Sequence, residues 1–494
     1  MSLDQIESIV YELTKKGFQL DPEAYNKISE LLNLNNDIDL KKSLLEIVEE
    51  KKKVDQTNIF INESDIVSLF PKKEELFNEK LVYDEIQAEI KLVRDPGNEI
   101  EMLEGIDGFK KYFLDRYNKL MKIVNSRPFQ KTITKIEEVN KNTKNVRIAG
   151  LVKEKKVSKE RTLLEIEDDT GVLRIIAKSE PHTQAAIEAL LDQMLIVDIA
   201  AFNGGVAFAS RIEFPEIPDR IFHSSSSEIY ALLLSDLHIG SKTFQKEAFE
   251  HLVHWLKGYH GEREIVKKIK YIIIAGDIVD GVGVYPHQDD DLEITNINEQ
   301  YFLAAQYIDQ LPKNMQIIII PGNHDAIRQA LPQPSIPKKY SQELYRLQNV
   351  KIYGNPLEVK LNGVNFLIYH GRSLDDVFAH SPTVESAKPE NAMKTLLRAR
   401  HLAPIFGGRT IIAPSKEDTL VIENPPDVFH AGHVHVFGYS KYRNTLIVNS
   451  GTFQGQTAYQ KSIGINPTPG IAAVINLKSL EIYVKDFNKI AIIQ

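Results

Sequence analysis

The sequence of 494 residues contains no cysteine, which excludes disulfide scaffolds, thiolate-held zinc, iron–sulfur clusters and cysteine nucleophiles. No apolar run approaches the roughly 20 residues that a membrane helix needs. The first residues lack the basic and then apolar pattern of a signal peptide. We therefore expect a cytoplasmic protein with no membrane partner.

The chain also lacks an excess of basic residues, since 60 Lys and Arg stand against 68 Asp and Glu. A protein that binds nucleic acid on its own is usually basic, so this balance counts against tight autonomous DNA binding. It leaves open a nuclease whose metal ions meet the phosphates, or a subunit whose partner holds the DNA. Hydrophobic residues make up 43% and charged residues 26%, which is ordinary for a globular chain.

The N-terminal part of the chain has a helical pattern. Residues 1–50 carry apolar side chains at helical spacing, with Gly17 as a stop and Asp21 as a cap for a second helix. Three short helices make a poor core by themselves, so we expect a docking module. Residues 51–80 are charged and weakly patterned, which fits a linker or, equally, a solvated helix. Residues 81–130 are expected to form a mixed connecting segment with one helix.

Residues 131–222 change to alternating strands. The clearest hairpin joins Leu164–Glu167 to Val172–Ile176 through the turn Asp168–Gly171. Five short strands with one helix fit an OB-like barrel. Such a barrel either binds single strands or packs between other units. Few aromatic residues are available for base stacking, so packing is the favoured interpretation.

Residues 228–494 repeat a buried strand, a polar loop and a helix. The predicted strands are apolar on both faces, which is typical of inner strands in a sheet covered by other elements. They are Tyr230–Leu234, Tyr271–Ala275, Ile317–Ile320 and Phe366–Tyr369. Ligand sites in such folds lie at the carboxyl ends of the strands.

Polar clusters follow the strands of this region, and they offer only oxygen and imidazole donors. The clusters are Ser235–His238, Gly276–Asp280, Gly322–Asp325, His370-Gly371 and Gly432–His435. Such donors suit manganese, iron or zinc. One histidine at a strand end is more often structural than a ligand. The ordered set of clusters favours a metal site.

The order of these clusters resembles the calcineurin-like metallophosphoesterase superfamily, whose pattern is DxH, GD, GNH(D/E), H and GHxH. The resemblance implies a two-sheet phosphoesterase domain over residues 228–494. The whole chain is then an α/β multidomain protein with a helical module, an OB-like barrel and this domain. It also implies two divalent metal ions, with Mn²⁺ first and Fe²⁺, Zn²⁺ or Ni²⁺ compatible.

The resemblance implies a role for each polar residue. One ion would be held by Asp236, His238 and His435, and the other by Asn323, His370 and His433. Asp277 would bridge the two ions. His324 would be the catalytic residue that stabilises the phosphate or protonates the leaving oxygen. Asp280 and Asp325 would orient the ligands.

Further motifs lie outside the expected ligands. They are the stretches 279–286, 328–334, 370–376 and 397–404. These motifs follow an OB-like domain in the chain. In that order they resemble the small subunits of archaeal DNA polymerase D, which are related to the B subunits of eukaryotic replicative polymerases. Those B subunits have lost metal ligands, whereas every ligand position is filled here. The resemblance therefore implies an active, proofreading 3′→5′ exonuclease in a heterodimer with a large catalytic polymerase subunit, acting on DNA 3′ ends.

Two alternatives stay open at this stage. The chain could be a non-enzymatic scaffold for the large subunit, or a stand-alone phosphoesterase that needs no partner. Arg400 and His401 are weak candidates for contacting substrate, because an ion pair with a nearby carboxylate would explain each of them as well.

Overall fold

The computed structural model describes residues 2–21, 24–25, 60–61, 83, 85–128, 131–159, 161–178, 180–462 and 464–489. The chain divides into two compact units, Met1–Val82 and Tyr83–Gln494. The site discussed below lies in the second unit.

The first unit begins with α1 (Ser2–Lys15), as its apolar spacing predicts. The helix ends at Lys15, and Gly17 in the turn beyond it has a φ of +87°, which suits glycine, as predicted for the stop. The backbone N–H of Ala24 donates to the Asp21 carboxylate at 2.6 Å, as expected of a helix cap. The strand β1 (Gln19–Leu20) pairs in parallel with β2 (Phe60–Ile61). The expected third helix and most of the predicted linker lie outside the described residues.

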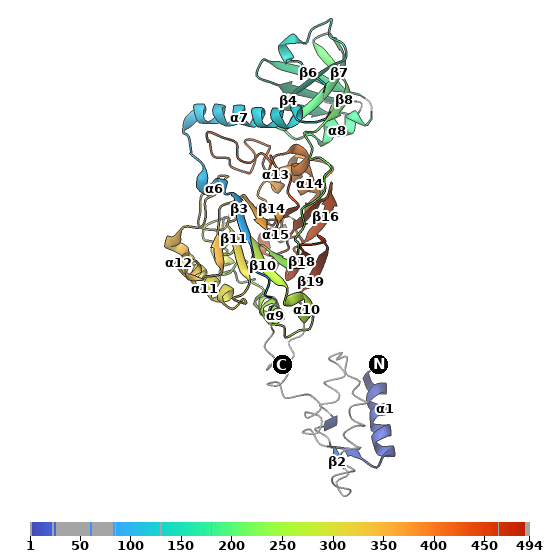
Figure 1. Ribbon diagram of the computed structural model, residues 1–494, viewed down its shortest axis with the longest axis vertical. Coiled ribbons are helices and arrows are strands. Elements are labelled where there is room, and N and C mark those ends of the chain that lie inside the picture. Colours follow the sequence, from blue (N-terminus) through green and yellow to red (C-terminus); the bar gives the residue numbers. More distant parts are fainter. Residues whose placement is uncertain are drawn as a thin grey trace. The chain divides into compact units, whose positions relative to one another are not determined.

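The second unit contains a six-stranded sheet in the order β12-β11-β10-β9-β18-β19 (Figure 1). Its inner strands β9, β10 and β11 run parallel and are almost wholly buried, because Ile and Leu fill both faces. The bounds are β9 (Tyr230–Leu234), β10 (Ile269–Ala275), β11 (Gln316–Ile320), β12 (Val350–Ile352), β18 (Ile471–Asn476) and β19 (Ile482–Asp486).

A second six-stranded sheet has the order β16-β17-β15-β14-β13-β3. One apolar core contains side chains of both sheets, so the sheets pack face to face. The bounds are β3 (Ile90–Arg94), β13 (Leu357–Leu361), β14 (Val364–Ile368), β15 (Val428–Ala431), β16 (Gly438–Tyr442) and β17 (Thr445–Asn449). The two-sheet α/β architecture predicted for this region is confirmed.

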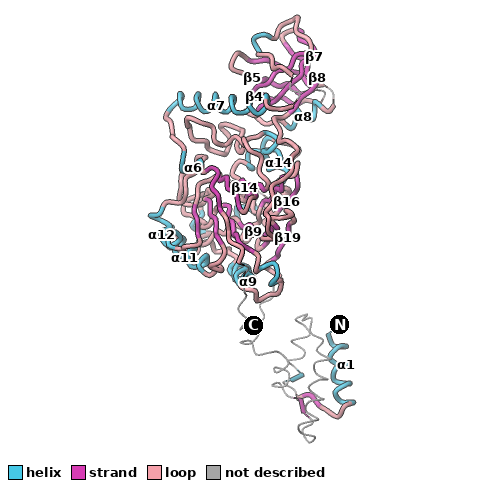
Figure 2. The backbone as a smooth tube through the Cα atoms, viewed as in Figure 1, coloured by secondary structure: helices cyan, strands magenta, loops and turns pink. Residues whose placement is uncertain are grey.

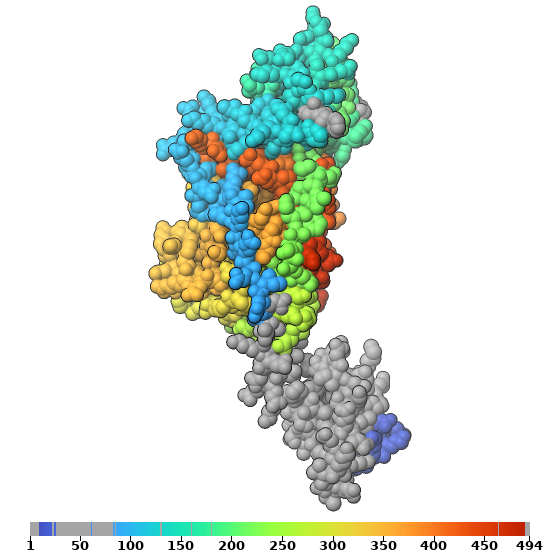
Figure 3. All heavy atoms as spheres, viewed as in Figure 1, coloured from blue at the N-terminus to red at the C-terminus, as the bar shows by residue number. Residues whose placement is uncertain are grey.

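The edge strand β3 comes from the segment that was predicted to be a mixed connection with one helix. It pairs antiparallel with β13, and Figure 3 shows this part of the chain (blue) on the surface of the domain. Nothing in the five residues of β3 signals that pairing, because three of them are exposed.

Helices cover the two sheets, as Figure 2 shows. A second apolar core joins α13 and α14 to the outer face of the second sheet. The helices of this part are α9 (Lys246–Leu256), α10 (Arg263–Val266), α11 (Ile297–Asp309), α12 (Lys338–Arg346), α13 (Leu374–His380), α14 (Pro389–Ala399) and α15 (Ala458–Ser462). The 3₁₀ turn η2 spans Gln288–Asp290.

The expected five-stranded barrel is present and closed, in the order β4-β5-β6-β8-β7. The predicted hairpin is confirmed, since β5 pairs with β6 and Asp168 N–H donates to the Gly171 carbonyl at 3.1 Å. The bounds are β4 (Val146–Val157), β5 (Thr162–Glu167), β6 (Val172–Ala177), β7 (Met194–Asn203) and β8 (Val206–Glu213), with α8 (His182–Glu188) and the 3₁₀ turn η1 (Ile136–Glu138).

The long helix α7 (Gly105–Asn125) follows the short α6 (Pro96–Glu99) and joins the barrel to the two-sheet part. Leu120 and Val124 of α7 pack against barrel residues and against Val421 in one small core. Arg116 on the same helix is buried against Asp418. No helix among the described residues is long and apolar enough to cross a membrane.

Candidate metal centre

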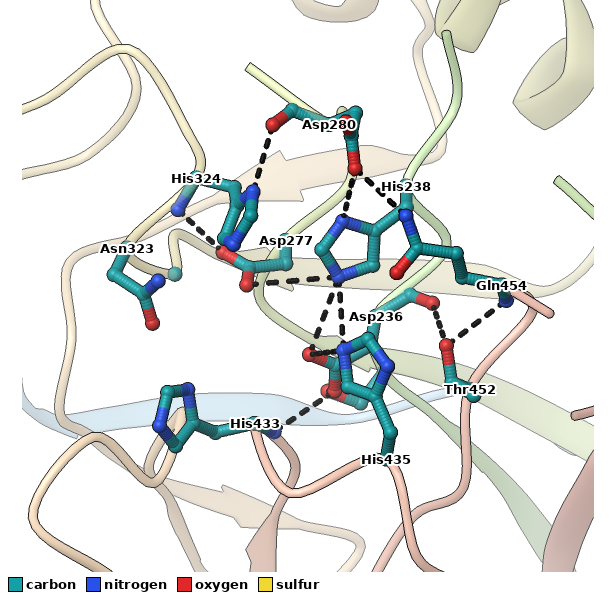
Figure 4. Close-up of polar contacts among 12 residues, drawn as sticks. Asp236, His238, Asp277, Asp280, Asn323, His324, His433, His435, Thr452 and Gln454 are labelled. Atoms are coloured by element: carbon teal, nitrogen blue, oxygen red, sulfur yellow. Dashed lines mark hydrogen bonds and ion pairs between the residues drawn. The ribbon is translucent and has the colours of Figure 1, made fainter. Parts of the chain in front are cut away.

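The predicted clusters meet where parallel strands of both sheets end. Asp236 follows β9, Asp277 follows β10, Asn323 follows β11, His370 follows β14, and His433 and His435 follow β15. Parallel strands bring their carboxyl ends to one edge, and two packed sheets bring two such edges together. The sequence pattern therefore becomes a single cluster in space (Figure 4).

The backbone at these loops adopts a conformation that side-chain-bearing residues rarely take. Positive φ angles occur at Asp236 (54°), His238 (51°), Asp277 (53°), His433 (69°) and His435 (62°). Each such conformation costs about 1–3 kcal/mol, and strain of this kind gathers at functional sites. At these five residues the strained backbone conformation directs the side chains toward one another.

Asp236, His238 and His435 form the first donor group. His435 Nε2 lies 3.3 Å from Asp236 Oδ1 and 3.0 Å from His238 Nε2. The other carboxylate oxygen of Asp236 accepts the N–H of His433 at 2.9 Å and also contacts the Ser235 hydroxyl. One oxygen of Asp236 is therefore committed to the loop, and the other faces two imidazoles.

Polar side chains fix the orientation of both imidazoles in that group. His238 Nδ1 lies 2.8 Å from Asp280 Oδ1, which also accepts the Gln454 amide at 2.9 Å. His435 Nδ1 lies 2.7 Å from Gln460 Nε2. With each Nδ1 occupied, each Nε2 is directed inward.

Asp277, His370 and His433 form the second donor group, with Asn323 beside it. His370 Nε2 lies 3.2 Å from Asp277 Oδ2 and 3.1 Å from Asn323 Oδ1. The His370 Nδ1–H donates to the carbonyl of Ala275 at 2.8 Å. Asp277 Oδ2 is also 3.8 Å from His238 Nε2, so this carboxylate lies between the two groups.

Gly322 lets these side chains approach the backbone. A Cβ at this position would lie 2.1 Å from Asp277 Oδ1 and 2.6 Å from His370 Cε1. Any other residue would displace the carboxylate, so this glycine of the Gly-Asn-His-Asp cluster is required by space.

His324 lies beside the first group and outside both carboxylate–imidazole contacts. Its ring is 4.6 Å from that of His238, and its Nδ1–H donates to the Asp280 carbonyl at 2.7 Å. Its backbone N–H donates to Asp277 Oδ1 at 2.8 Å. Burial and the charge of His238 lower the pKa of His324 to about 4, so the neutral imidazole keeps an unshared pair on Nε2.

Asp325 supports the loops from behind. Its carboxylate accepts the N–H groups of Gly322 (2.8 Å) and Asp277 (3.0 Å) and the hydroxyl of Tyr301 (2.9 Å). Burial and the charge of Asp277 raise the pKa of Asp325 to about 7. Asp325 therefore connects the loops that carry Gly322 and Asp277, and its own carboxylate oxygens are occupied by these hydrogen bonds.

The donor set fits divalent metal ions, and the charges of the site support this fit. Asp236 Oδ1 is buried and accepts no hydrogen bond, and the imidazole of His435 lies 3.3 Å from it. A buried carboxylate oxygen without hydrogen bonds is costly, and a bound cation would remove that cost. Burial would raise the pKa of Asp277, but the charges of the surrounding histidines hold it well below its ordinary value. Burial would lower the pKa of His238, yet contacts with Asp236 and Asp280 raise it to about 10. Carboxylates and imidazoles thus compensate one another in this site, and the carboxylates stay ionised, which is the state in which they could bind a cation.

The site opens into a cavity of about 540 Å³. His324, Asn323 and His433 line it together with Tyr285, Tyr459 and the two arginines Arg372 and Arg409. His433 Nε2 lies 3.2 Å from Asp375 Oδ2, another residue of this wall. The burial that would raise the pKa of Asp375 is outweighed by His433 and Arg372, which lower it to about 2.

The two weak candidates lie elsewhere. Arg400 lines a different and larger cavity, of about 770 Å³, beside the end of α7, and it donates to the carbonyl of Ile422 at 2.7 Å. The His401 ring is buried between Asp418, 2.8 Å from Nε2, and the N–H of Ala403, 3.0 Å from Nδ1. Neither side chain lines the cavity at the strand ends. The structure gives both residues hydrogen-bonding roles within the fold.

Sequence reasoning predicted Asp280 and Asp325 as orienting residues but missed the glutamines that act beside them. Gln454 lies in a late loop and Gln460 on α15, and neither belongs to a motif that would mark it. Asp375 stands in one of the stretches singled out in the sequence, but without an assigned role. Their contacts depend on long-range folding that no local pattern records.

Comparison with known proteins places this architecture in a family. The family of the B subunits of DNA polymerases alpha and epsilon matches residues 231–438. The DNA polymerase II small subunit of Archaeoglobus fulgidus is 41% identical over 390 residues, which cover 78% of each chain. The protein of the same name from Pyrococcus horikoshii is 39% identical over 404 residues, which cover 80% of this chain but only 64% of that relative. A solved archaeal phosphodiesterase aligns with 52% of this chain and 99% of its own, at 13% identity and a TM-score of 0.27. The chain belongs to the small-subunit family of archaeal DNA polymerase II, the family D enzyme.

Proposed function

We propose that the cavity at the strand ends hydrolyses DNA phosphodiesters from 3′ ends with two divalent ions, Mn²⁺ being the expected metal. The observation that carries this proposal is the convergence of carboxylate, imidazole and amide donors from five strand ends, around a buried carboxylate oxygen of Asp236 that accepts no hydrogen bond and faces imidazoles only. An exonuclease of this kind would proofread for the polymerase to which the subunit belongs.

The two donor groups suggest how the ions would be held. Asp236, His238 and His435 would bind one ion, and Asn323, His370 and His433 the other. Asp277 would serve both, because it lies between the groups. Bound divalent ions would polarise the phosphate and lower the pKa of an attacking water.

His324 is the proposed catalytic residue. It lines the cavity, and its hydrogen bond to the Asp280 carbonyl fixes the ring. Its Nδ1–H is engaged by the Asp280 carbonyl, so Nε2 would have to gain a proton to stabilise the phosphate or to pass that proton to the leaving oxygen. The negative charge of a bound phosphate would favour this protonation. The bond that breaks joins phosphorus to the 3′ oxygen of the shortened strand, so the released product is a nucleoside 5′-monophosphate.

A 5′-labelled single-stranded oligonucleotide tests this proposal. With Mn²⁺ we expect a ladder that shortens from the 3′ end, and its loss in His324→Ala and Asp277→Asn. Asp289→Asn removes a carboxylate from an exposed position of a nearby loop and is the matched control. Cleavage of bis-p-nitrophenyl phosphate without cleavage of DNA would indicate a stand-alone phosphoesterase instead.

A second role, as the tether of the large catalytic subunit, is favoured by a separate observation. A groove of about 470 Å³ runs along α7 and contains Ile106, Phe109, Phe113, Leu114 and Phe406. Ile106 is 77% exposed and Leu114 54%. Apolar exposure of this kind marks interaction sites, and the carboxylates at its border suit a partner with basic flanks.

The tethering role has its own test. Leu114→Asp should abolish co-purification with the large subunit while hydrolysis by the isolated chain persists. Ile221→Asp changes an even more exposed apolar residue (89%) outside the groove and should leave the complex intact. Complex formation by Leu114→Asp at wild-type strength would contradict this role for the groove.

A further inference from the structure

A row of aromatic rings leads from the metal centre to the surface. The ring of Tyr285 lies 6.2 Å from that of His324, with 61° between their planes. On its other side, Tyr285 stacks on Tyr459 with centroids 5.9 Å apart and planes only 23° apart. Both tyrosines line the same cavity as His324.

Both tyrosines are held by the surrounding structure. The Tyr285 hydroxyl donates to Asp291 Oδ2 at 3.0 Å. Tyr459 lies on α15, and the next residue of that helix, Gln460, contacts His435 Nδ1 at 2.7 Å. The backbone that carries Tyr459 is therefore tied to a proposed metal ligand, which holds this part of α15 beside the proposed metal centre.

The Tyr459 ring is 54% exposed although it lines a cavity. An apolar ring that stays in water at the entrance of a charged site stabilises nothing within the fold by its outer face. Aromatic faces beside cationic surfaces are the usual platform for bases of single strands. Arg372 and Arg409 in the same cavity supply the cationic surface for phosphates.

We propose that Tyr459, backed by Tyr285, stacks on the base of one of the two nucleotides that flank the scissile phosphate. This inference rests on the proposed DNA hydrolysis and assigns Tyr459 a part in choosing which 3′ ends are hydrolysed. A base that stacks on Tyr459 has left the duplex, so unpaired 3′ ends should be preferred over paired ones.

The test uses the full chain and single-stranded oligonucleotides with 2-aminopurine in one of the last two positions or five positions inward. Stacking on a ring quenches the fluorescence of this base. Binding is measured with Ca²⁺, and cleavage is scored on the same samples and again with Mn²⁺. We expect quenching at the end positions only, and binding about 5- to 150-fold weaker in Tyr459→Leu, the range that corresponds to the loss of one stacked base.

Two further variants separate stacking from general effects. Tyr459→Phe keeps the flat ring and should retain both quenching and the preference for unpaired ends. Tyr439 is 47% exposed and packs on Phe437 at 5.9 Å, outside the cavity, so Tyr439→Leu is the matched control. Equal Mn²⁺ affinity in wild type and Tyr459→Leu would show that the metal centre is unaltered.

The outcomes of the two proposals can be told apart. Equal quenching, affinity and end preference in wild type and Tyr459→Leu would overturn the stacking inference while cleavage with Mn²⁺ stands. Quenching that is lost in Tyr459→Leu, in a chain that cleaves nothing with Mn²⁺, would support stacking and contradict the proposed hydrolysis.

Discussion

Asp280 Oδ1 lies 2.8 Å from His238 Nδ1, and both side chains are buried. The same carboxylate also accepts the amides of Gln288 at 3.1 Å and Gln454 at 2.9 Å. Three donors therefore hold Asp280 in one orientation, and Asp280 holds the imidazole. His238 is left with only Nε2 available to meet a metal ion.

Replacing Asp280 with Asn should weaken Mn²⁺ binding about 10- to 100-fold, because the group that orients His238 loses its charge. The NH₂ of the new side chain would also face the amides that now donate to the carboxylate. Isothermal titration with Mn²⁺ measures the effect. Asp289→Asn, at an exposed position of the same loop, should bind as the wild type does. Equal affinity in Asp280→Asn would contradict the orienting role.

Mn²⁺ should raise the melting temperature of the chain, and a chelator should reverse the gain. A ligand that binds only the folded state at 100 times its dissociation constant stabilises that state by about 2.7 kcal/mol. Asp236→Asn removes the charge of a carboxylate whose Oδ1 accepts no hydrogen bond and is free to bind the ion, so most of the gain should vanish. Differential scanning fluorimetry at increasing Mn²⁺ concentration gives the answer. A full gain in Asp236→Asn would place the metal elsewhere.

Replacing Arg116 with Leu should destabilise the second unit by about 3–5 kcal/mol, because Asp418 would stay buried without its cation. Arg116 Nε lies 2.7 Å from Asp418 Oδ2, and both side chains are fully buried. The single tryptophan, Trp255, is buried and reports unfolding in urea by its fluorescence.

Lys110→Leu on the same helix is the control for this substitution. Lys110 and Asp107 form an exposed pair at 3.8 Å, so the free energy of unfolding should change by less than about 1 kcal/mol. Similar losses in the two variants would mean that the buried pair has no special role.

Acid should weaken the fold through His401. Burial and the charge of Arg116 lower its pKa to about 4, against an ordinary value near 6.5. Between pH 6.5 and 4, His401 is protonated in the unfolded chain but stays neutral in the folded chain. The free energy of unfolding therefore falls as the pH drops from about 6.5 to 4. The loss from this one group is on the order of 3 kcal/mol.

His401→Gln isolates that contribution, because glutamine does not titrate. Urea unfolding at several pH values should show a shallower decline for the variant between pH 6.5 and 4. Other buried histidines contribute equally to both proteins, so the difference between the two curves is the quantity to read. Parallel curves would show that His401 does not titrate in this range on unfolding.

The central strands of the fold could be predicted because nearly all their residues are apolar. The isoleucine-rich runs that became β10 and β11 are apolar on both faces, which only a covered inner strand explains. The hairpin around Asp168 carries its own turn signal. The strand β3 could not be predicted, since its place is set by pairing with β13, more than 250 residues further along the chain.

The candidate site divides in the same way. The proposed ligands could be listed because polar clusters follow apolar strands and because the order of these clusters resembles that of the calcineurin-like metallophosphoesterases. Arg400 and His401 were singled out for their chemistry, but packing places them against Ile422 and Asp418. The supporting role of Gln460 depends on where the short helix α15 packs against the site, which no local pattern in the sequence predicts.

The most direct test of the proposed hydrolysis uses an unlabelled single-stranded oligonucleotide with Mn²⁺ in ¹⁸O-labelled water, followed by mass spectrometry of the products. We expect nucleoside 5′-monophosphates released from the 3′ end, each with one ¹⁸O on its phosphate, and no release by Asp277→Asn. Nucleoside 3′-phosphates, or no release from a chain that has bound Mn²⁺, would contradict the proposal.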